Sequence, residues 1–356
     1  ILFTHTSFKW TNNAKDNAGV TVVIIGLANT SRNVKTIFCN GMEKKVNGIN
    51  AYLSNGANTI IQRRSNPLSD FKEMSFGNMP ADGGNLIMSE MERVELLKHN
   101  PESEKYIKKL LGAQEFIRGQ IRYCLWISDE EQGEAIRIST ISERINKVKN
   151  IREKSARPQL AKTPYKFAQI TAPPNSNQII MPSVSSERRE YIPSGFLGAD
   201  TVISNLALVV CDAEPWLLGI LNSKIHMIWL KNIGGKLGNQ WRYSKDIVYN
   251  NFPFPPISTQ RKKEITQAVF RILEEREKHS DKTLSQLYDP DNMPDGLHEA
   301  HRQNDEIIEN CYRSTPFKSD EERLEYLFKL YKKMIEEEKE QGTLFAKESK
   351  TRKKRK

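Results

Sequence analysis

The run Val20-Thr21-Val22-Val23-Ile24-Ile25 constrains the fold of this chain more than any other feature. Six consecutive β-branched residues without polar alternation predict a strand buried on both faces, as in a large α/β sheet. Residues 1–6 predict a neighbouring strand, and the polar residues 11–19 predict the loop between the two. A short segment has nothing to cover both faces of such a sheet. Because the first residue is Ile rather than Met, we expect a piece of a longer protein whose upstream part completes the sheet.

The remaining sequence predicts an α+β fold. A length of 356 residues allows about two or three domains. We expect the final strands of a truncated domain over residues 1–30 and a mixed domain of short strands and helices over residues 31–256. Consecutive prolines at Pro255 and Pro256 mark the boundary to a small all-α domain over residues 257–340, and residues 341–356 are expected to be a basic disordered tail. In the mixed domain the expected strands are residues 59–62, 178–181, 201–203 and 206–211.

Helix signals are clearest in the second half of the chain. Pro215 suits a first helical turn, Ser258 is a helix cap, and Ser319-x-x-Glu322 is a capping box. The helix that follows Pro215 has apolar residues at i, i+3, i+4 spacing. The expected helices are residues 139–153, 214–232, 258–278, 294–311 and 320–338.

Charge is distributed unevenly along the chain. Residues 1–256 carry 32 basic and 23 acidic side chains, a net +9; residues 257–340 carry 15 and 20, a net −5; and residues 341–356 carry 7 and 1, a net +6. Nine of the basic side chains lie between Arg137 and Lys166, where only Glu143 and Glu153 are acidic. A basic body beside acidic helices favours a polyanionic partner, most simply nucleic acid. The alternative is a solvated cationic face without a partner.

Several classes of protein are disfavoured. The longest apolar run is far shorter than the roughly 20 residues of a membrane span, and no signal peptide opens the chain. The four cysteines form no Cys-x-x-Cys pair, so we expect reduced thiols in a cytoplasmic protein rather than a zinc site or disulfides. The six histidines lack metal-ligand spacing, and His298 and His301 are expected to be structural or exposed. We expect no metal and no membrane partner.

Catalytic signatures are absent from the sequence. It contains no Gly-x-Gly-x-x-Gly, Gly-x-x-x-x-Gly-Lys-[Ser/Thr], Gly-x-Ser-x-Gly or His-Glu-x-x-His motif. Asn66-Pro67 and Asn100-Pro101 do not continue into the Asn-Pro-Pro-Tyr loop with which adenine methyltransferases hold the target amine. By itself this chain is not expected to catalyse a reaction or to bind a cofactor.

Two stretches carry recognition chemistry instead. Ser183-Val184-Ser185-Ser186-Glu187-Arg188-Arg189-Glu190-Tyr191 combines hydroxyls with arginine forks, which suit phosphates or guanine edges. Its alternative is a salt-bridged turn in which the arginines pair with Glu187 and Glu190. Gly234-Gly235-Lys236-Leu237-Gly238-Asn239-Gln240-Trp241-Arg242-Tyr243-Ser244 follows the expected helix as a long polar loop with side chains able to contact adenine and guanine. Its alternative is an ordinary loop around a buried Trp241.

Several segments occur together in an order that resembles one family, the MmeI-like DNA methyltransferases. They are Phe8-Lys9-Trp10, Phe76-Gly77-Asn78-Met79-Pro80, Ser185 to Pro193, Ser223 to Trp229, Arg242-Tyr243-Ser244 and Leu287-Tyr288-Asp289-Pro290. Such proteins are bacterial single-chain type IIG/IIL restriction–modification enzymes with a nuclease, an adenine-N6 methyltransferase, a target recognition domain and a helical C-terminal domain. The resemblance covers nearly the whole chain and matches the C-terminal part of the family.

The resemblance implies roles for particular residues. Phe8 is the first candidate and Trp10 the second for the aromatic side chain that would stack on the flipped-out adenine, although a core role for either is equally open. Gly238, Gln240 and Arg242 match base-reading positions, and Gly238 departs from the charged residue that is often found there. Gln240 would select adenine and Arg242 guanine. The turn Ser204-Asn205-Leu206 is a second candidate reading point. The expected DNA-binding residues are Ser185, Ser186, Arg188, Arg189, Asn205, Lys236, Gly238, Asn239, Gln240 and Arg242.

These observations favour a DNA sequence-recognition module that binds double-stranded DNA. By resemblance, an upstream methyltransferase domain of the same chain would use S-adenosylmethionine to methylate the adenine. Two alternatives stay open. One is a protein-interaction scaffold, favoured by the acidic helices; the other is a stand-alone enzyme such as a nuclease.

Overall fold

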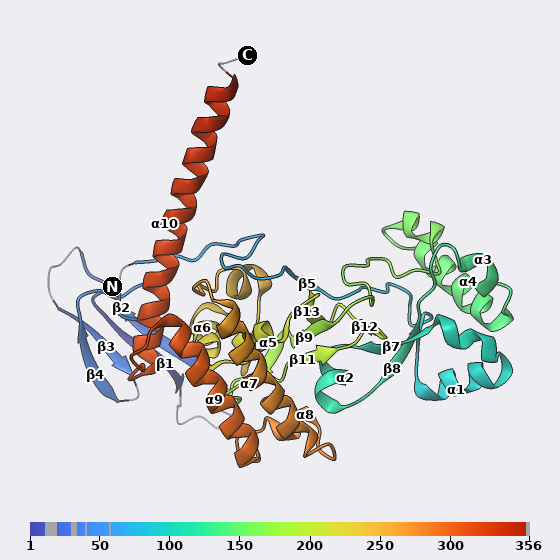
Figure 1. The fold of residues 1–356 in the computed structure, drawn as a ribbon, viewed down its shortest axis with the longest axis horizontal. Helices are drawn as coiled ribbons and strands as arrows, with labels where there is room; N and C mark the ends of the chain where they lie inside the picture. Colours follow the sequence, from blue (N-terminus) through green and yellow to red (C-terminus); the bar gives the residue numbers. More distant parts are fainter. Residues whose placement is uncertain (11–19, 30–33, 40, 57, 354–356) are drawn as a thin grey trace.

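The computed structural model describes residues 1–10, 20–29, 34–39, 41–56 and 58–353. The loop expected at residues 11–19 lies outside the described residues. Within them, strands form four small sheets and helices dominate the C-terminal part, which confirms the α+β prediction. Figure 1 shows an elongated molecule: the N-terminal sheet (blue) lies near one end, a sheet with its own helices (cyan and green) lies at the other, and most of the C-terminal helices (orange) lie between them.

The N-terminal sheet has the strand order β2-β1-β3-β4. Its strands are β1 (Phe3–Trp10), β2 (Val20–Gly26), β3 (Lys35–Cys39) and β4 (Met42–Val46). The strand expected from the β-branched run is therefore present, but in the described residues β2 is an edge strand. Val23, Ile24 and Ile25 are 46 %, 41 % and 44 % exposed. Since successive side chains of a strand point to opposite faces, β2 is uncovered on both within the described residues, and the cover that we expect for these faces was assigned to an upstream part of the protein.

The sheet at the far end has the order β12-β7-β8-β6. Its strands are β6 (Ile87–Met88), β7 (Ile107–Leu111), β8 (Arg122–Leu125) and β12 (Thr201–Ile203). The helices here are α1 (Glu90–His99), α3 (Gln132–Ala135), α4 (Ser139–Glu153) and the 3₁₀ turns η1 (Pro101–Tyr106) and η2 (Pro158–Lys162). The helix expected over residues 139–153 is confirmed as α4, which buries Ile141, Ile145 and Val148 in one core with strand residues.

The central sheet has the order β11-β9-β13-β5. Its strands are β5 (Met74–Phe76), β9 (Gln178–Pro182), β11 (Gly195–Leu197) and β13 (Ala207–Cys211), and α2 (Ala113–Arg118) contacts β9. Three of the four strands expected in the mixed domain are confirmed by β9, β12 and β13. Residues 59–62 form no strand; the Ile61 N–H donates to the Tyr52 hydroxyl instead of to a neighbouring strand.

The single helix expected over residues 214–232 is wrong, because two helices stand there. They are α5 (Pro215–Leu221) and α6 (Lys224–Ile233), with a break at Asn222 and Ser223. The Ser223 hydroxyl donates to the Ile220 carbonyl at 2.7 Å and accepts from the His226 N–H at 3.3 Å. The same side chain therefore ends one helix and caps the next, which is the local competition that makes serine a poor residue inside a helix.

The C-terminal part consists of α7 (Thr259–Glu277), α8 (Leu284–Leu287), α9 (Asp295–Tyr312) and α10 (Asp320–Lys353). Ser258 and Ser319 accept hydrogen bonds from the Arg261 and Glu322 N–H groups, as caps do. Helix α7 packs against α5 and α9, and one continuous core contains side chains from both sides of Pro256. In Figure 1 α10 projects from the body. It continues through residues 341–353, where we expected a disordered tail and where Lys, Glu and Ala favour helix.

Candidate nucleic-acid interface

The two stretches singled out in the sequence pair with each other in the remaining sheet, which has the order β10-β15-β14. Its strands are β10 (Val184–Ser186), β14 (Gly235–Leu237) and β15 (Gln240–Arg242). The polar stretch expected as a loop is thus a hairpin, turned by Gly238 and Asn239. Gly238 has a φ of +58°, which glycine adopts without strain at the first central position of a tight hairpin turn. A side chain there would strain the turn, so Gly238 shapes the hairpin and has no side chain with which to read a base.

The register of this sheet gathers the base-reading candidates on one face. Arg242 pairs with Val184 and Gly235, and Gln240 pairs with Ser186 and Leu237. Directly paired residues share a face, and so do residues two apart on a strand. Gln240 and Arg242 are both exposed. We call this surface the outer face; its residues are Val184, Ser186, Gly235, Leu237, Gln240 and Arg242.

The opposite, inner face is formed by Ser185, Lys236 and Trp241. The Lys236 ammonium lies 4.4 Å from the centroid of the Trp241 ring and 3.2 Å from a carboxylate oxygen of Glu187. Ser185 is only 3 % exposed, and among the described residues its hydroxyl and the Trp241 Nε1 have no hydrogen-bond partner. Strand alternation therefore turns Ser185 toward the protein and Ser186 outward, although the sequence placed both in the DNA-binding set.

A buried pair holds the base of the hairpin. Tyr243, which follows Arg242, has its hydroxyl 2.9 Å from Nε2 of His226 in α6, and its N–H donates to the Ser183 carbonyl at 2.8 Å. Both side chains are buried. Burial lowers the pKa of His226 to about 3, so its imidazole is neutral near pH 7. Hydrogen bonds of Tyr243 to the buried core therefore hold the base of the hairpin in place.

The two expected DNA-binding arginines of the first stretch contact the C-terminal helical part. Arg188 is exposed and forms an ion pair with Asp291. Arg189 is half-buried, burial lowers its pKa, and its Nη2 lies 3.3 Å from the Ser285 hydroxyl. A salt-bridged turn therefore exists, but not with the partners we considered, since Glu187 pairs with Lys236 and Glu190 lies 3.3 Å from His298. Arg188 keeps an exposed guanidinium, whereas Arg189 is a packing residue in this structure.

A buried polar network behind this turn was missed in the sequence. The Tyr191 hydroxyl donates to Asp305 of α9 at 2.7 Å, and the Tyr191 ring stacks on His301 at 4.2 Å between centroids. Asp305 also accepts from the N–H of Lys224, the first residue of α6, at 2.7 Å. Burial raises the pKa of Asp305 to about 7. Leu297, His301 and Asp305 recur at i, i+4 spacing along α9, a signal that predicts burial of the histidine and the carboxylate.

The other candidates lie apart from the hairpin. Asn205 is half-buried at the turn between β12 and β13, and its N–H donates to the Asn78 carbonyl at 2.9 Å. Phe8 and Trp10 lie on β1, are 36 % and 49 % exposed, and have ring centroids 6.3 Å apart. Both rings are available for stacking on a partner, and neither is buried in a core of the described residues.

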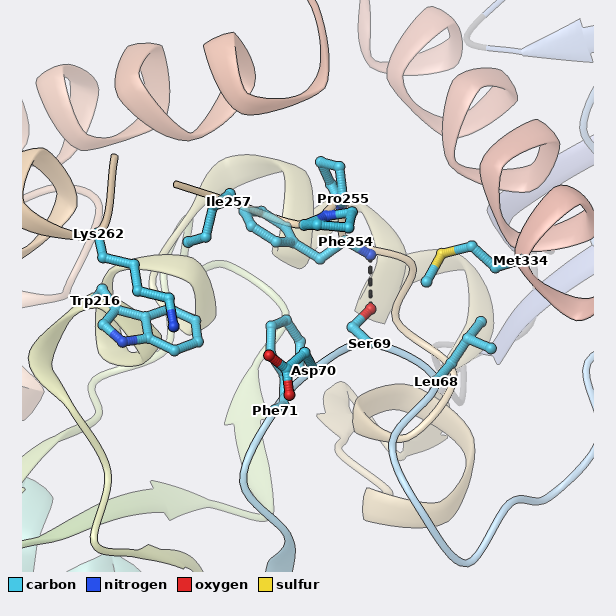
Figure 2. Close-up of a pocket in the computed structure, with 11 residues that line it drawn as sticks. Leu68, Ser69, Asp70, Phe71, Trp216, Phe254, Pro255, Ile257, Lys262 and Met334 are labelled. Atoms are coloured by element: carbon cyan, nitrogen blue, oxygen red, sulfur yellow. Dashed lines mark hydrogen bonds between the residues drawn. The ribbon is translucent and has the colours of Figure 1, made fainter. Parts of the chain in front are cut away.

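A pocket of about 230 Å³ lies where the loop at residues 68–71 meets α5 and the start of the C-terminal part. Figure 2 shows its aromatic and aliphatic lining, including Trp216 and Phe254. Ser69 accepts from the Phe254 N–H at 2.8 Å, and the Lys262 ammonium lies 4.5 Å from the Trp216 ring centroid. Its hydroxyl and ammonium groups are thus engaged with the walls. We interpret the pocket as a packing feature of the domain junction rather than as a site.

Family models match the chain almost end to end. Residues 55–256 match "MmeI, target recognition domain", residues 257–337 match "MmeI, C-terminal domain", and residues 1–39 match "MmeI, DNA-methyltransferase domain". The chain belongs to the MmeI family. The hairpin lies within the target recognition domain of the MmeI model, and Phe8 and Trp10 lie within the methyltransferase match.

Relatives of the MmeI family agree with this assignment. DNA methyltransferase A of Bacillus subtilis (strain 168) is 46 % identical over 340 residues, which are 94 % of this chain and 38 % of the relative. The solved structure of the type IIL restriction–modification enzyme MmeI in complex with DNA matches with a TM-score of 0.82 at 34 % identity, covering 94 % of this chain and 46 % of that one. The chain therefore spans less than half the length of either relative.

Proposed function

We propose that this chain is the DNA sequence-recognition part of a restriction–modification adenine-N6 DNA methyltransferase and positions a methyltransferase domain on its site. The observation that carries the proposal is the outer face, from which Gln240 and Arg242 project two residues apart on the central strand β15. Gln binds adenine N6/N7 and Arg binds guanine O6/N7 in the major groove, each pair worth about 1–3 kcal/mol of discrimination. The solved structure of the related MmeI enzyme in complex with DNA supports DNA as the partner, and we propose that this DNA is double-stranded.

The support beneath the outer face suits this task. Side chains that discriminate bases must be held by packing and by hydrogen bonds behind them. The Tyr243–His226 pair fixes the base of β15, and the Tyr191–Asp305 pair fixes the turn after β10. We therefore propose that the C-terminal helices contribute to recognition by holding the sheet, since Asp305 belongs to α9.

Phosphate contacts are proposed to set the register on DNA. Exposed cations cluster on and after α4, and they are Lys147, Lys149, Lys154, Arg157 and Lys162. Each phosphate that such a residue neutralises releases counterions, so affinity falls with salt. We propose that Arg188 also contacts a phosphate, which would replace Asp291 as the partner of its guanidinium when DNA binds. Arg189 and Ser185, which are packed inward, are left out of the proposed contacts.

The methylation step is proposed to belong to the rest of the methyltransferase domain. Its model matches only residues 1–39 here, and these carry none of the glycine-rich or Asn-Pro-Pro-Tyr motifs sought above. We propose S-adenosylmethionine as the cofactor of that domain and adenine as the target, with Phe8 or Trp10 stacking on the extruded base. Among the residues that the structure describes, no helix has the length and hydropathy to cross a membrane. The cytoplasm, where such an enzyme meets DNA, is the proposed location.

Duplex binding by the full-length protein tests this proposal. Fluorescence anisotropy at two salt concentrations compares the wild type with Arg242→Ala and with the matched control Arg302→Ala, an exposed arginine of α9 that pairs with Glu299 and Glu306. We expect wild-type affinity to fall steeply with salt. On a site enriched from random DNA, Arg242→Ala is expected to lose about tenfold in affinity or more, and Arg302→Ala to retain wild-type affinity.

Two results of this experiment would contradict the proposed function. Absence of binding at low salt, or equal affinities of Arg242→Ala and Arg302→Ala, would favour the protein-interaction scaffold that the acidic helices suggested.

A further inference from the structure

Leu237 is exposed where an apolar side chain has no structural task. It is the last residue of β14, next to the hairpin turn, and is 56 % exposed. It belongs to none of the hydrophobic clusters formed by the described residues. Its neighbours Lys236, Asn239 and Gln240 are polar. The hairpin therefore holds an isolated apolar group in solvent, at a cost that packing within the chain does not offset.

The register places Leu237 beside one reader only. It pairs directly with Gln240, so the two side chains share the outer face and their Cβ atoms lie roughly 5 Å apart. The corresponding partner of Arg242 on β14 is Gly235, which has no side chain. On the β14 side the Gln240 amide therefore has an apolar neighbour and the Arg242 guanidinium has none, whereas on the β10 side their neighbours are Ser186 and Val184.

The pairing of Leu237 with Gln240 matches the chemistry of a base pair in the major groove. An A·T pair presents adenine N6 and N7, which suit a Gln amide, and on the same edge the thymine C5-methyl, which suits an apolar side chain. A G·C pair presents guanine O6 and N7, which suit Arg, and no methyl group. Gln240 together with Leu237 therefore complements an A·T pair, and the Arg242 guanidinium complements the guanine of a G·C pair.

We propose that Leu237 is a specificity-determining residue that contacts the thymine methyl group at the position where Gln240 reads adenine. This inference rests on the proposed function and adds to it the identity of both bases of one pair. Recognition of the thymine is apolar, through its methyl group, whereas recognition of the adenine is by hydrogen bonds. Burial of one methyl group accounts for about a fourfold change in affinity.

The test replaces thymine by uracil, which removes only the methyl group. Sites enriched from random duplex DNA by the full-length protein are resynthesised with uracil at each thymine in turn, and binding is measured by anisotropy. We expect one thymine at which uracil weakens wild-type binding about fourfold. At that position Leu237→Ala is expected to bind the two duplexes equally, and Leu237→Val to retain part of the difference. Met91→Ala, which removes an exposed apolar side chain of α1, keeps the full ratio.

The outcomes separate the inference from the function on which it rests. An enriched site at which no thymine responds to uracil, or an unchanged thymine-to-uracil ratio in Leu237→Ala, overturns the role of Leu237 and leaves the recognition function standing. A failure of the wild type to enrich any sequence overturns both. Comparing ratios within each variant removes any general loss of binding that a perturbed hairpin would cause.

Discussion

Two basic regions of this molecule, helix α4 with the residues after it and the hairpin β14–β15, use arginine in opposite ways. Arg152 of α4 is 2 % exposed and donates five hydrogen bonds to main-chain carbonyls at residues 80, 81, 160, 163 and 166. Arg242 of β15 is exposed, and its guanidinium forms no hydrogen bond or ion pair with the residues that the structure describes. The first arginine holds three chain segments together, while the second is free to meet a ligand.

The density of positive charge along the sequence therefore does not by itself locate a recognition surface. The segment from Arg137 to Lys166 is the more basic of the two, yet its most buried arginine is structural. Arg144, on the same helix, also bonds to the Asn85 carbonyl and to Glu92. The hairpin has fewer cations, but the sheet register aims its reading side chains in one direction. Geometry rather than charge distinguishes the two regions.

The largest expected effect concerns Arg152. Arg152→Ala removes five partly buried hydrogen bonds, each worth about 0.5–1.5 kcal/mol, and leaves the Ala81 and Lys166 carbonyls without the donor that they have in the described residues. We expect the free energy of unfolding, measured by urea denaturation, to fall by about 3 kcal/mol or more. Arg242→Ala, the matched change in the hairpin, is expected to alter it by less than about 0.5 kcal/mol. Equal losses of stability in the two variants would contradict the different structural roles of the two arginines.

The attachment of the hairpin gives a pH-dependent prediction. The pKa of buried His226 is about 3 in the folded protein against an ordinary value of 6.5. A depressed pKa stabilises the fold above pH 6.5, and this contribution is lost as pH falls toward 3. Between pH 7.5 and 5 the loss from His226 amounts to about 2 kcal/mol. We therefore expect His226→Gln to be about that much less sensitive to acid than the wild type in urea denaturation.

Asp305 is expected to change the stability in the opposite direction to His226 as the pH changes. Its pKa is raised to about 7 from 3.8, so its contribution is present below about pH 4 and is lost as pH rises through 7. The aspartate thus opposes the histidine over the same interval. If Asp305→Asn and His226→Gln shifted the pH dependence of unfolding in the same direction, the opposite directions given for the two pKa shifts would be wrong.

The smallest expected effect concerns the turn of the hairpin. At Gly238 an added Cβ meets no atom within 4 Å, so only the positive φ opposes a side chain. Gly238→Ala is expected to lower the free energy of unfolding by about 1 kcal/mol. Gly133 of α3 is equally uncrowded but has no positive φ, and Gly133→Ala is expected to cause no loss. Equal stabilities of the two alanine variants would contradict a constrained turn.

Local patterns predicted the elements that local interactions determine. Helix α4 and the caps at Ser258 and Ser319 follow from spacing and capping chemistry, and both recognition stretches were found from their residue types. The break between α5 and α6 was missed because an apolar period continues across Ser223, whose hydroxyl serves both helix ends.

Relations between distant segments could not be predicted in this way. Nothing in the sequence of residues 183–191 says that they pair with residues 240–242, and only that pairing turns Ser185 inward and Ser186 outward. The Arg188–Asp291 ion pair likewise joins segments that only the tertiary fold brings together. The same holds for Leu237, whose role follows from its cross-strand neighbour.

The proposed function depends on the outer face of the hairpin reading DNA sequence. The most direct measurement is enrichment of random duplex DNA by the full-length protein and by its Arg242→Ala variant, followed by sequencing. We expect a defined site for the wild type and, for the variant, loss of preference at one guanine while the other positions are kept. Uniform weakening at every position, or an unchanged site, would show that Arg242 does not read a base.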